Sequence, residues 1–567
     1  MNIIPHLRQS LVSVISTLTD LSPADARQLD VKLNIEKREQ FGDISCNVGL
    51  LLAKKMQLQP REVAQRVKTM LEQRHDEPWN LVEKIEIAGP GFLNFYLKAD
   101  VWVGGMQALL KEPKKLFGLQ PGEKPLAYHL EFVSANPTGP VHLGGGRGGI
   151  IGDVLARVLK FVGHRVHTEY YINDAGNQMK LLGQSFKARC YEALGEAFVF
   201  PEGGYAGDYL LPISDDCVRL HGKTLLKLPD SFFETFAKDA LLKFILKDLE
   251  AYGVHFDQWF SEKSLHLDGS VAAAIKLLQD KGLAYEKEGA LWFKATDFGD
   301  DKDRVLCRSN GEMTYIAADV AYHKNKFDRG YDRLVDILGQ DHHGYVKRLQ
   351  ATMQALGYPA ERLDIIVYQL VSLKENDELV RMSKRAGTFT KLADVVETVG
   401  KDVARYFYLN RRAEAHLEFD LGVALKRTDE NPVFYLQYAY VRAASLMLKA
   451  KEEADLKAFV AEASDVDMFA QVLSSVALTG EDELVVYKKI MALYDVLRVI
   501  ADGYQTHMLA YYAYELATMF HAYYSQHKII DRENVSQTKG RLALVCLVKE
   551  ALGVCLELLG VDKPERM

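Results

Sequence analysis

The sequence predicts a multidomain α/β protein, and three observations point to that class. An apolar run at 128–133 leads through a glycine-rich turn into a stretch with helical periodicity. Strand-like and helix-like segments then alternate as far as about residue 404, and long helical patterns fill the remainder. At 567 residues the chain is also too long for a single hydrophobic core, so several domains are expected.

Residues 1–108 are predicted to form a small α+β domain. Apolar residues at helical spacing predict a helix over 7–18, and Pro60 is placed to begin another helix. Two strand-like runs, 82–88 and 92–97, are separated by Gly-Pro-Gly, a turn that needs the backbone freedom of glycine. These segments predict a strand hairpin packed on helices.

Residues 109–404 are predicted to form a Rossmann-like parallel-sheet domain. After a polar, proline-punctuated link at 111–125, the run 128–133 is expected to be a strand. The helix that follows should end at Gly163, and 164–172 supplies a second strand. This strand–helix–strand unit is the pattern of a parallel sheet, which binds ligands at the carboxyl ends of its strands.

The alternation is interrupted and then resumes. Helical segments and one strand-like run between about 180 and 295 predict an insertion. Strands are expected again at 334–338 and 363–370, with a helix at 345–356 between them. Residues 405–567 are predicted to be an all-α bundle. Long apolar-periodic segments mark its helices and the stretch leading into it, at 394–409, 432–451, 483–501, 509–526 and 539–559.

Composition narrows the function classes. The net charge of −7 means that nucleic-acid binding would have to come from local basic patches. Six scattered cysteines, without zinc-type spacing, predict reduced thiols and no protein-bound metal. No basic N-terminal region precedes a long apolar stretch, and there is no uncharged run of membrane-spanning length. We therefore expect a soluble cytoplasmic protein with no membrane association.

Two segments could handle phosphate. A helix that begins in glycines exposes backbone N–H groups at its positive end, which favours anions, although a glycine run alone is more often a flexible turn. Far downstream, the basic segment 381–388 could place an ammonium group on a polyphosphate, although a solvated loop is the simpler reading of it alone. Together the two segments favour a nucleotide site.

The motifs around these segments resemble those of the arginyl-tRNA synthetases, a family of class I aminoacyl-tRNA synthetases. The resemblance covers nearly the whole chain. The stretches that carry it are Glu131-Phe-Val-Ser-Ala-Asn-Pro-Thr-Gly-Pro140, Tyr170-Tyr-Ile-Asn-Asp-Ala-Gly-Asn-Gln178, Met382-Ser-Lys-Arg-Ala-Gly387, Asp429-Glu-Asn-Pro432 and the terminal Pro564-Glu-Arg-Met567.

The resemblance implies ATP-dependent ligation of L-arginine to tRNA(Arg) through an arginyl-adenylate, with release of AMP and diphosphate. It implies ATP with Mg²⁺ as the substrate complex and tRNA present during activation. The first domain would bind the tRNA elbow, and the bundle would read the anticodon. We expect a monomer.

The resemblance also implies site residues, which we carry over only where this sequence matches the family. The two residues expected to be catalytic are His142 and Lys384. The residues expected to bind ATP are His142, Gly144, Gly145, Gly146, Met382, Ser383 and Lys384. The residues expected to bind arginine are Glu131, Ser134 and Asn136 at its head, with Tyr315, Asp319 and Gln340 at its guanidinium. An Asp one helical turn from Tyr315 suits the planar guanidinium fork.

The tRNA contacts implied by the resemblance lie in both outer domains. They are Phe92 and Asn94 in the first domain and Tyr435, Tyr438, Arg442, Tyr524 and Met567 in the last. Aromatic rings and Arg suit unstacked bases. Tyrosines at helical spacing could equally be core residues, and Phe92 could be a buried strand residue.

One position departs from the family. Its first signature is His-x-Gly-His, and here Gly145 takes the place of the second histidine. We expect a working enzyme that tolerates this change. Two alternatives stay open: a different nucleotidyl transferase with a similar His-x-Gly turn, and a catalytically impaired homologue that acts as an RNA-binding protein.

Overall fold

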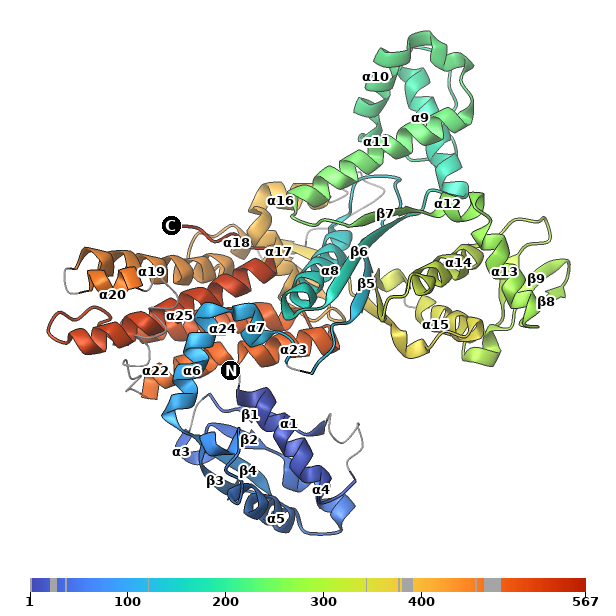
Figure 1. Ribbon diagram of the computed structural model, residues 1–567. Coiled ribbons are helices and arrows are strands. Elements are labelled where there is room, and N and C mark those ends of the chain that lie inside the picture. The colour runs from blue at the N-terminus through green and yellow to red at the C-terminus, as the bar shows by residue number, and fades with distance from the viewer. Residues whose placement is uncertain are drawn as a thin grey trace.

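The computed structural model describes residues 3–20, 28–35, 38–120, 122–342, 344–375, 378–379, 391–453, 456–462 and 481–567. Figure 1 shows a central sheet with a helical lobe above it, a bundle to one side and the N-terminal domain below the bundle. The multidomain α/β class is confirmed, with a parallel sheet in the middle and a helical C-terminal part.

The N-terminal domain is a four-stranded antiparallel sheet, in the order β1-β2-β4-β3, packed on helices. Its hairpin is as predicted, because Gly89 and Gly91 have φ angles of +51° and +141° that other residues rarely adopt. The proline at the start of α5 also matches the prediction. The elements are α1 (Ile3–Ser16), β1 (Val31–Leu33), α3 (Arg38–Phe41), β2 (Ile44–Cys46), α4 (Val48–Met56), α5 (Pro60–Glu72), η1 (Trp79–Leu81), β3 (Val82–Ala88) and β4 (Phe92–Leu97).

The connection to the sheet domain begins with two helices, the second of which lies inside the polar, proline-punctuated link predicted at 111–125. α6 (Ala99–Lys111) is followed at once by α7 (Pro113–Phe117), because Pro113 occupies the first turn, where its missing N–H costs nothing. Figure 1 shows this pair running from the N-terminal domain along the bundle to the sheet.

The central sheet has five parallel strands in the order β12-β11-β5-β6-β7. The chain runs from β5 through α8 to β6 and β7 on one side, and later returns to place β11 and β12 on the other side of β5. This reversal makes a switch point between β5 and β11, the usual ligand position in such sheets. The bounds are β5 (Ala127–Phe132), α8 (Leu143–Val162), β6 (Arg165–Ile172), β7 (Gln258–Ser261), β11 (Arg333–Gly339) and β12 (Leu363–Tyr368).

Glycine allows α8 to lie close to the sheet. A Cβ atom at Gly152 would lie 2.2 Å from the ring of Phe132, and one at Gly148 would lie 2.6 Å from the ring of Tyr368. The helix ends at Gly163, whose φ of +110° is the left-handed cap that the sequence predicts. The glycine-rich start therefore serves packing as well as any ligand.

A helical lobe leaves the sheet after β6, where the sequence predicts an insertion, and its helices bury a core of their own. One strand was missed, since β7 lies inside the predicted insertion and yet belongs to the central sheet. The domain boundaries given above remain predictions. The lobe elements are α9 (Asn177–Ala193), α10 (Leu210–His221), η2 (Gly222–Lys227) and α11 (Asp230–Ala251).

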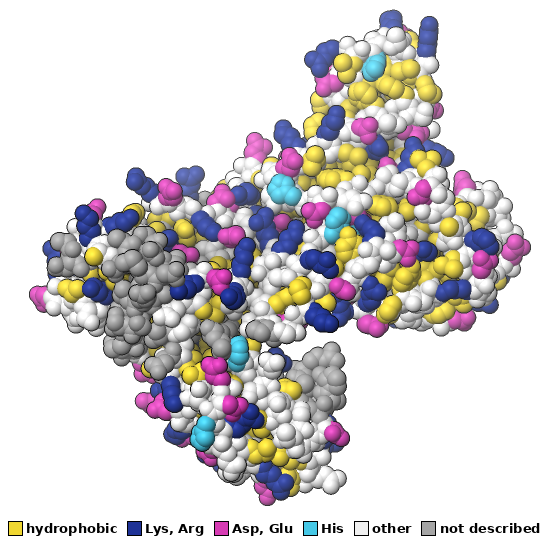
Figure 2. Space-filling view, in the orientation of Figure 1, with side chains coloured by type: hydrophobic (Ala, Val, Ile, Leu, Met, Phe, Trp, Pro, Cys, Tyr) yellow, Lys and Arg dark blue, Asp and Glu magenta, His cyan; other side chains and the backbone are white. Residues whose placement is uncertain are grey.

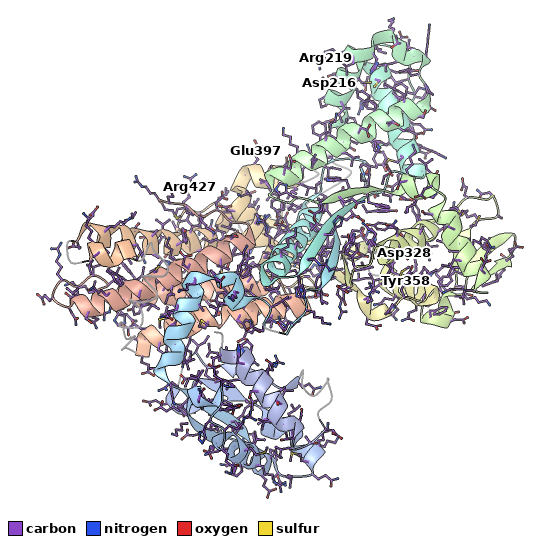
Figure 3. All side chains as sticks on the ribbon, viewed as in Figure 1. Asp216, Arg219, Asp328, Tyr358, Glu397 and Arg427 are labelled. Carbon is purple, nitrogen blue, oxygen red and sulfur yellow. The ribbon has the colours of Figure 1, made fainter. Side chains whose placement is uncertain are left out.

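A second excursion separates β7 from β11 and builds another small core. Its long helix α14 packs beside α15, and the side chains of Asp328 and Tyr358 meet there through a hydrogen bond of 2.5 Å (Figure 3). The elements are α12 (Glu262–Leu267), α13 (Ser270–Asp280), β8 (Ala284–Lys287), β9 (Ala290–Phe293), η3 (Ala295–Phe298), β10 (Arg304–Cys307), α14 (Tyr315–Asp328), η4 (Gln340–His342), α15 (Tyr345–Leu356) and η5 (Ala360–Arg362).

The C-terminal part is helical apart from β15, which pairs in parallel with β13. Two helices predicted as continuous are broken. Gly400, with φ of +83°, divides 394–409 into α16 and α17, and a break at Ala492 divides 483–501. The elements are β13 (Val371–Glu375), β14 (Glu378–Leu379), α16 (Leu392–Val399), α17 (Lys401–Leu409), β15 (Leu417–Asp420), α18 (Leu421–Ala424), α19 (Pro432–Glu452), α20 (Lys457–Glu462), α22 (Glu481–Met491), α23 (Leu493–Gly503), α24 (His507–Gln526) and α25 (Val535–Leu559).

Arg405 joins the bundle to the sheet domain. Its guanidinium is fully buried in α17, donates to the carbonyl oxygens of Leu559 at 2.8 Å and Tyr252 at 3.0 Å, and pairs with Asp153 of α8. The ends of α25 and α11 and the middle of α8 therefore meet at one side chain. A Cβ atom at Gly560 would lie 2.3 Å from this guanidinium, which explains the glycine there.

Candidate active site

The carboxyl ends of β5 and β11 form the floor of the site. Phe132 and Ile337 are partners in the register, so the segments that follow the two strands lie next to each other. Directly after β5, Val133 and Ser134 have φ angles of +68° and +40°. Such angles cost non-glycine residues about 1–3 kcal/mol each and are typical of functional turns. The strain marks this edge of the sheet as the candidate site.

Glu131 and Ser134, expected at the head of arginine, contact each other. The Ser134 hydroxyl donates to Glu131 Oε1 at 2.9 Å and accepts from the Tyr171 N–H at 3.1 Å. Asn136 follows, and its Nδ2 donates to Gln178 Oε1 at 2.7 Å. A buried carboxylate beside a hydroxyl can receive an α-ammonium group.

Asp319, expected at the guanidinium, is the least satisfied acid of the site. Its Oδ2 is buried and has no hydrogen-bond partner in the described part of the chain. Burial is the main cause that raises the pKa of Asp319 to about 7; the charge of His323 opposes it, and the nearby carboxylates of Glu262 and Glu131 add to it. An orphaned buried acceptor calls for a donor, and a guanidinium supplies several. Tyr315 lies one turn earlier on α14 and is half exposed.

Glu262 is a further residue of the site that was not predicted from the sequence. It is the first residue of the short helix α12, directly after β7, and only 5% of it is exposed. Burial raises the pKa of its carboxyl. The pKa of the Tyr171 hydroxyl is raised by burial and then by the charges of Glu262, Asp319 and Glu131, so all three carboxylates lie near this hydroxyl. An acidic residue at the carboxyl end of a strand was the available signal, but recognising it required the four-residue strand β7.

His142, expected to be catalytic, caps α8. Its Nδ1 accepts from the N–H of Gly144 at 3.0 Å, so in the neutral ring the proton is on Nε2. Gly146 is buried, and a Cβ atom there would lie 2.6 Å from Leu392. Gly145 has a helical φ, and a Cβ atom on it would lie 3.2 Å from Val141 Cγ1. Packing therefore explains the glycine at position 146. At position 145 a side chain would fit only if Val141 moved slightly.

Arg147, the charged residue of the glycine-rich start, faces inward. It is fully buried and donates to the carbonyl oxygens of Gln369, Ala415 and Arg412 at 2.7–2.9 Å. Burial lowers its pKa to about 10. Its hydrogen bonds tie α8 to the loops beyond β12 and before β15, so its role is structural.

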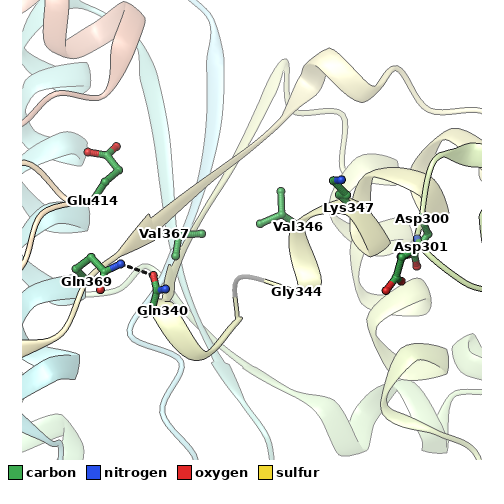
Figure 4. A pocket seen from close by; sticks show the side chains of 9 residues that line it. All are labelled: Asp300, Asp301, Gln340, Gly344, Val346, Lys347, Val367, Gln369 and Glu414. Atoms are coloured by element: carbon green, nitrogen blue, oxygen red, sulfur yellow. Dashed lines mark hydrogen bonds between the residues drawn. The ribbon is translucent and has the colours of Figure 1, made fainter.

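Gln340 lies in a cavity of about 600 Å³ beyond the carboxyl ends of β11 and β12 (Figure 4). Its Oε1 accepts from Gln369 Nε2 at 2.7 Å. A cavity of this volume is in the range of small-molecule sites. Its lining residues are Asp300, Asp301, Gln340, Gly344, Val346, Lys347, Val367, Gln369 and Glu414.

Met382, Ser383 and Lys384 lie outside the described residues. The described residues resume at Lys391, next to the signature turn. Lys391 forms an antiparallel bridge with His142, and the N–H of Leu392 donates to the carbonyl of Val141 at 2.9 Å. The chain therefore re-enters the described structure beside His142.

Two of the tRNA candidates in the bundle stack on one arginine. The guanidinium of Arg442 lies 4.4 Å from the ring centre of Tyr438 and 4.5 Å from that of Tyr524. Tyr435 reaches the same cluster through His521, at 4.4 Å between ring centres. Tyr438 is 43% exposed, so this cluster of tyrosines and arginine is open to solvent.

The remaining tRNA candidates differ in exposure. Met567 is 48% exposed at the C-terminus. On β4, Phe92 is half buried, whereas only 2% of Asn94 is exposed. A nearly buried Asn94 offers little surface to a bound nucleic acid. Figure 2 shows basic and acidic side chains interspersed on one face of the molecule, with Lys and Arg numerous across its middle.

The described residues contain neither a metal-binding cluster nor a helix that could span a membrane. No cluster of three or more His, Cys, Asp or Glu residues could hold a metal ion there. Within the same residues, no helix is long and apolar enough to cross a membrane. The six cysteines are free thiols.

Three family models match the chain in sequence order. They are the arginyl-tRNA synthetase N-terminal domain at 5–97, the class I (R) tRNA synthetase catalytic domain at 106–199 and 225–412, and the DALR anticodon-binding domain at 436–567.

Whole-length relatives agree with these models. The arginine–tRNA ligase of Syntrophotalea carbinolica is 42% identical, over 95% of both chains, and that of Oleidesulfovibrio alaskensis is 41% identical, over 99% of both. The structure of Thermus thermophilus arginyl-tRNA synthetase superposes with a TM-score of 0.74 at 20% identity, covering 100% of both chains, which supports the fold. None of these findings favours an impaired RNA-binding homologue.

Proposed function

Because the chain belongs to the arginyl-tRNA synthetases, we propose that arginine and ATP react in the crevice beyond β5 and β11 while the outer domains hold the tRNA. The chain ligates arginine to tRNA at the expense of ATP, as its arginine–tRNA ligase relatives do. The observation that carries the placement is the buried Asp319 Oδ2, which has no hydrogen-bond partner among the described residues. A guanidinium would satisfy it.

The reaction has two transfers. An arginine carboxylate oxygen attacks the α-phosphorus of ATP and diphosphate leaves; a ribose hydroxyl of the tRNA then attacks the carbonyl of the arginyl-adenylate and AMP leaves. Neither transfer needs a protein nucleophile, so catalysis rests on positioning and on stabilising phosphate charge. Glu131 and Ser134 would orient the α-ammonium, and Asp319 with Glu262 would hold the guanidinium.

The nucleotide would lie between the α8 N-terminus and the cavity that contains Gln340. The support is the switch-point position and the His142 cap, whose Nε2–H is suited to a phosphate oxygen. Lys384, which lies outside the described residues, is proposed on the family resemblance alone to add an ammonium to the phosphates. Mg²⁺ would arrive with ATP and supply charge neutralisation. A monomeric, cytoplasmic enzyme stays a prediction.

Asp319→Asn tests the arginine site. Loss of the charge should weaken binding of the transition state by about 1.5–3 kcal/mol, the range for a charge-assisted hydrogen bond, and so lower kcat/KM for arginine. The KM for tRNA should stay the same. Steady-state charging with labelled arginine measures both values. If the arginine KM and kcat/KM of the variant equal those of the unmodified enzyme, Asp319 does not bind the guanidinium.

The pH dependence supplies the control for this variant. Since the pKa of Asp319 is raised to about 7, its charged form increases between pH 6 and 8, and the arginine KM should fall over that interval. The folded state binds more protons than the unfolded state between about pH 4 and 7, so the stability of the unliganded enzyme should fall as pH rises through 7. Asp319→Asn should flatten both profiles.

We propose that the cluster of Tyr435, Tyr438, Arg442 and Tyr524 stacks with anticodon bases. Tyr438→Ala should weaken tRNA binding by about 1–3 kcal/mol, the value for a lost base stack, in a folded protein. Filter binding or titration of tRNA measures it. Tyr440→Ala, on another face of the same helix near Gly553, serves as control and should leave tRNA affinity unchanged. Equal affinities for both variants would make Tyr438 a structural residue.

Gly145→His tests whether the site has adapted to the missing histidine. We expect the unmodified enzyme to charge tRNA efficiently and the variant to bring little gain, because a side chain there crowds Val141. The comparison is kcat for charging at saturating arginine, ATP and tRNA. A gain of about 10²-fold, the lower value for one transition-state donor, would show a decayed site instead.

A further inference from the structure

A lysine is fully buried beneath the candidate arginine site. Lys326, near the C-terminal end of α14, places its ammonium between two carboxylates of neighbouring strands: Glu131 of β5, which it contacts directly, and Asp336 of β11 at 2.8 Å. Glu131 and Asp336 are direct partners in the sheet register. The ammonium also lies 4.3 Å from the ring centre of Tyr322. The lysine therefore bridges the two strands whose ends form the site.

The contacts continue from Asp336 towards the other end of the site. Asp336 Oδ2 lies 2.7 Å from His323 Nε2, and His323 Nδ1 lies 2.9 Å from the backbone carbonyl oxygen of Asp319. A continuous chain of polar contacts thus runs from Glu131 through Lys326, Asp336 and His323 to the backbone of Asp319. All these side chains are buried or nearly so.

Three members of this chain of contacts lie on one helix. Asp319, His323 and Lys326 recur at i, i+4 and i+7 and so share a face of α14. The helix is also fastened at its C-terminal end, where Phe327 stacks on Tyr358 at 4.5 Å between ring centres. The position of Asp319 relative to Glu131 therefore depends on how Lys326 fixes α14 against β5.

The charges hold the arrangement together. Burial alone would lower the pKa of Lys326, but the carboxylates of Asp336 and Glu131 outweigh it and raise the pKa. Burial would likewise raise the pKa of Asp336, but Lys326 and His323 hold it well below its ordinary value. The lysine and the aspartate are both charged at neutral pH, and buried charges of this kind keep their partners in defined positions.

We propose that Lys326 and Asp336 are positioning residues that fix the separation between Glu131 and Asp319 and so select the length of the amino-acid side chain. The proposal rests on the arginine pocket proposed above. Arginine spans Glu131 at its α-ammonium and Asp319 at its guanidinium. Homoarginine, whose side chain has one more methylene, would lose one of the two contacts in a pocket of fixed length. Discrimination of about 10–200-fold is usual for one methylene.

The test compares three variants of the full-length enzyme. Lys326→Met removes the ammonium and keeps most of the volume, and Asp336→Asn removes the middle charge. Arg329→Met is the matched control, because Arg329 caps α14 and pairs at 2.7 Å with Glu169, a buried carboxylate of β6 outside the proposed pocket. Charging kinetics with arginine and with homoarginine, together with thermal unfolding, are measured for each variant.

Lys326→Met and Asp336→Asn, the two pocket variants, should raise the arginine KM by about tenfold or more, the scale of a misplaced binding group. Their kcat should change less. Their preference for arginine over homoarginine should narrow, and the KM for ATP and tRNA should stay within about twofold of the unmodified enzyme. Arg329→Met should lower the unfolding temperature without moving the arginine KM or the preference. Arginine kinetics in the pocket variants that match those of Arg329→Met would overturn the proposal.

Two further arms keep the result decisive. If Lys326→Met does not fold, Asp336→Asn alone decides, since Glu131 keeps its lysine in that variant. Asp319→Asn, measured in parallel, separates the two proposals. A raised arginine KM in Asp319→Asn with unchanged kinetics in Lys326→Met and Asp336→Asn would overturn the positioning role only. Unchanged arginine kinetics in Asp319→Asn, Lys326→Met and Asp336→Asn would contradict the proposed arginine pocket as well.

Discussion

His142→Asn is expected to lower kcat for arginine charging by about 10²–10³-fold, the loss associated with one donor to a developing charge. Asparagine can accept the Gly144 N–H and so keep the cap of α8, but it lacks the second ring nitrogen that would reach a phosphate oxygen. Single-turnover formation of arginyl-tRNA measures the loss without interference from product release.

His142→Ala provides the comparison. It should lose the cap as well and become less stable by about 1 kcal/mol, while its rate matches that of the Asn variant. The His142→Asn variant should therefore be as stable as the unmodified enzyme but charge tRNA more slowly. A His142→Asn enzyme that charges tRNA at nearly the unmodified rate would limit His142 to capping.

Arg405→Met is expected to cost about 3–5 kcal/mol of stability, the usual result of removing one partner from a buried ion pair. The substitution leaves the carbonyl oxygens of Leu559 and Tyr252 without their donor and removes a partner of Asp153. Denaturant and thermal unfolding measure the loss.

Arg157→Met is the matched control. Arg157 also pairs with Asp153, at 2.7 Å, but its side chain is 34% exposed. Partly exposed pairs contribute about 1 kcal/mol or less. If both substitutions cost the same stability, the burial of Arg405 does not determine how much it contributes to stability.

The sequence predicted elements best where local signals coincide. The β3–β4 hairpin follows from the Gly-Pro-Gly turn, whose glycines have positive φ, and α19 begins at Pro432, where the apolar periodicity predicts a helix; the structure adds Asn431 as its cap. Breaks inside apolar-periodic stretches were missed. Gly400 ends a helix although the periodicity continues across it, because its position in the left-handed region becomes visible only when the chain packs.

The candidate site divides in the same way. His142 and Asp319 could be proposed because they belong to contiguous motifs. Glu262 could not, since the strand before it has only four residues, and Lys326 could not, since its partner Glu131 is 195 residues away in the sequence. A lysine in an amphipathic helix is ordinarily solvent-exposed, and only the fold places Lys326 between two carboxylates.

The strand order also has a consequence for biosynthesis. β5 can pair with β6 soon after both leave the ribosome, but its other neighbour, β11, is made about 200 residues later, after roughly 10–40 s of translation. The lobe formed by α9, α10 and α11 has a core of its own and can fold within that interval. One edge of β5 waits unpaired meanwhile, and an unpaired edge is open to strand pairing with other chains. The nascent chain is therefore exposed to aggregation at the strand that carries Glu131 until β11 has been made.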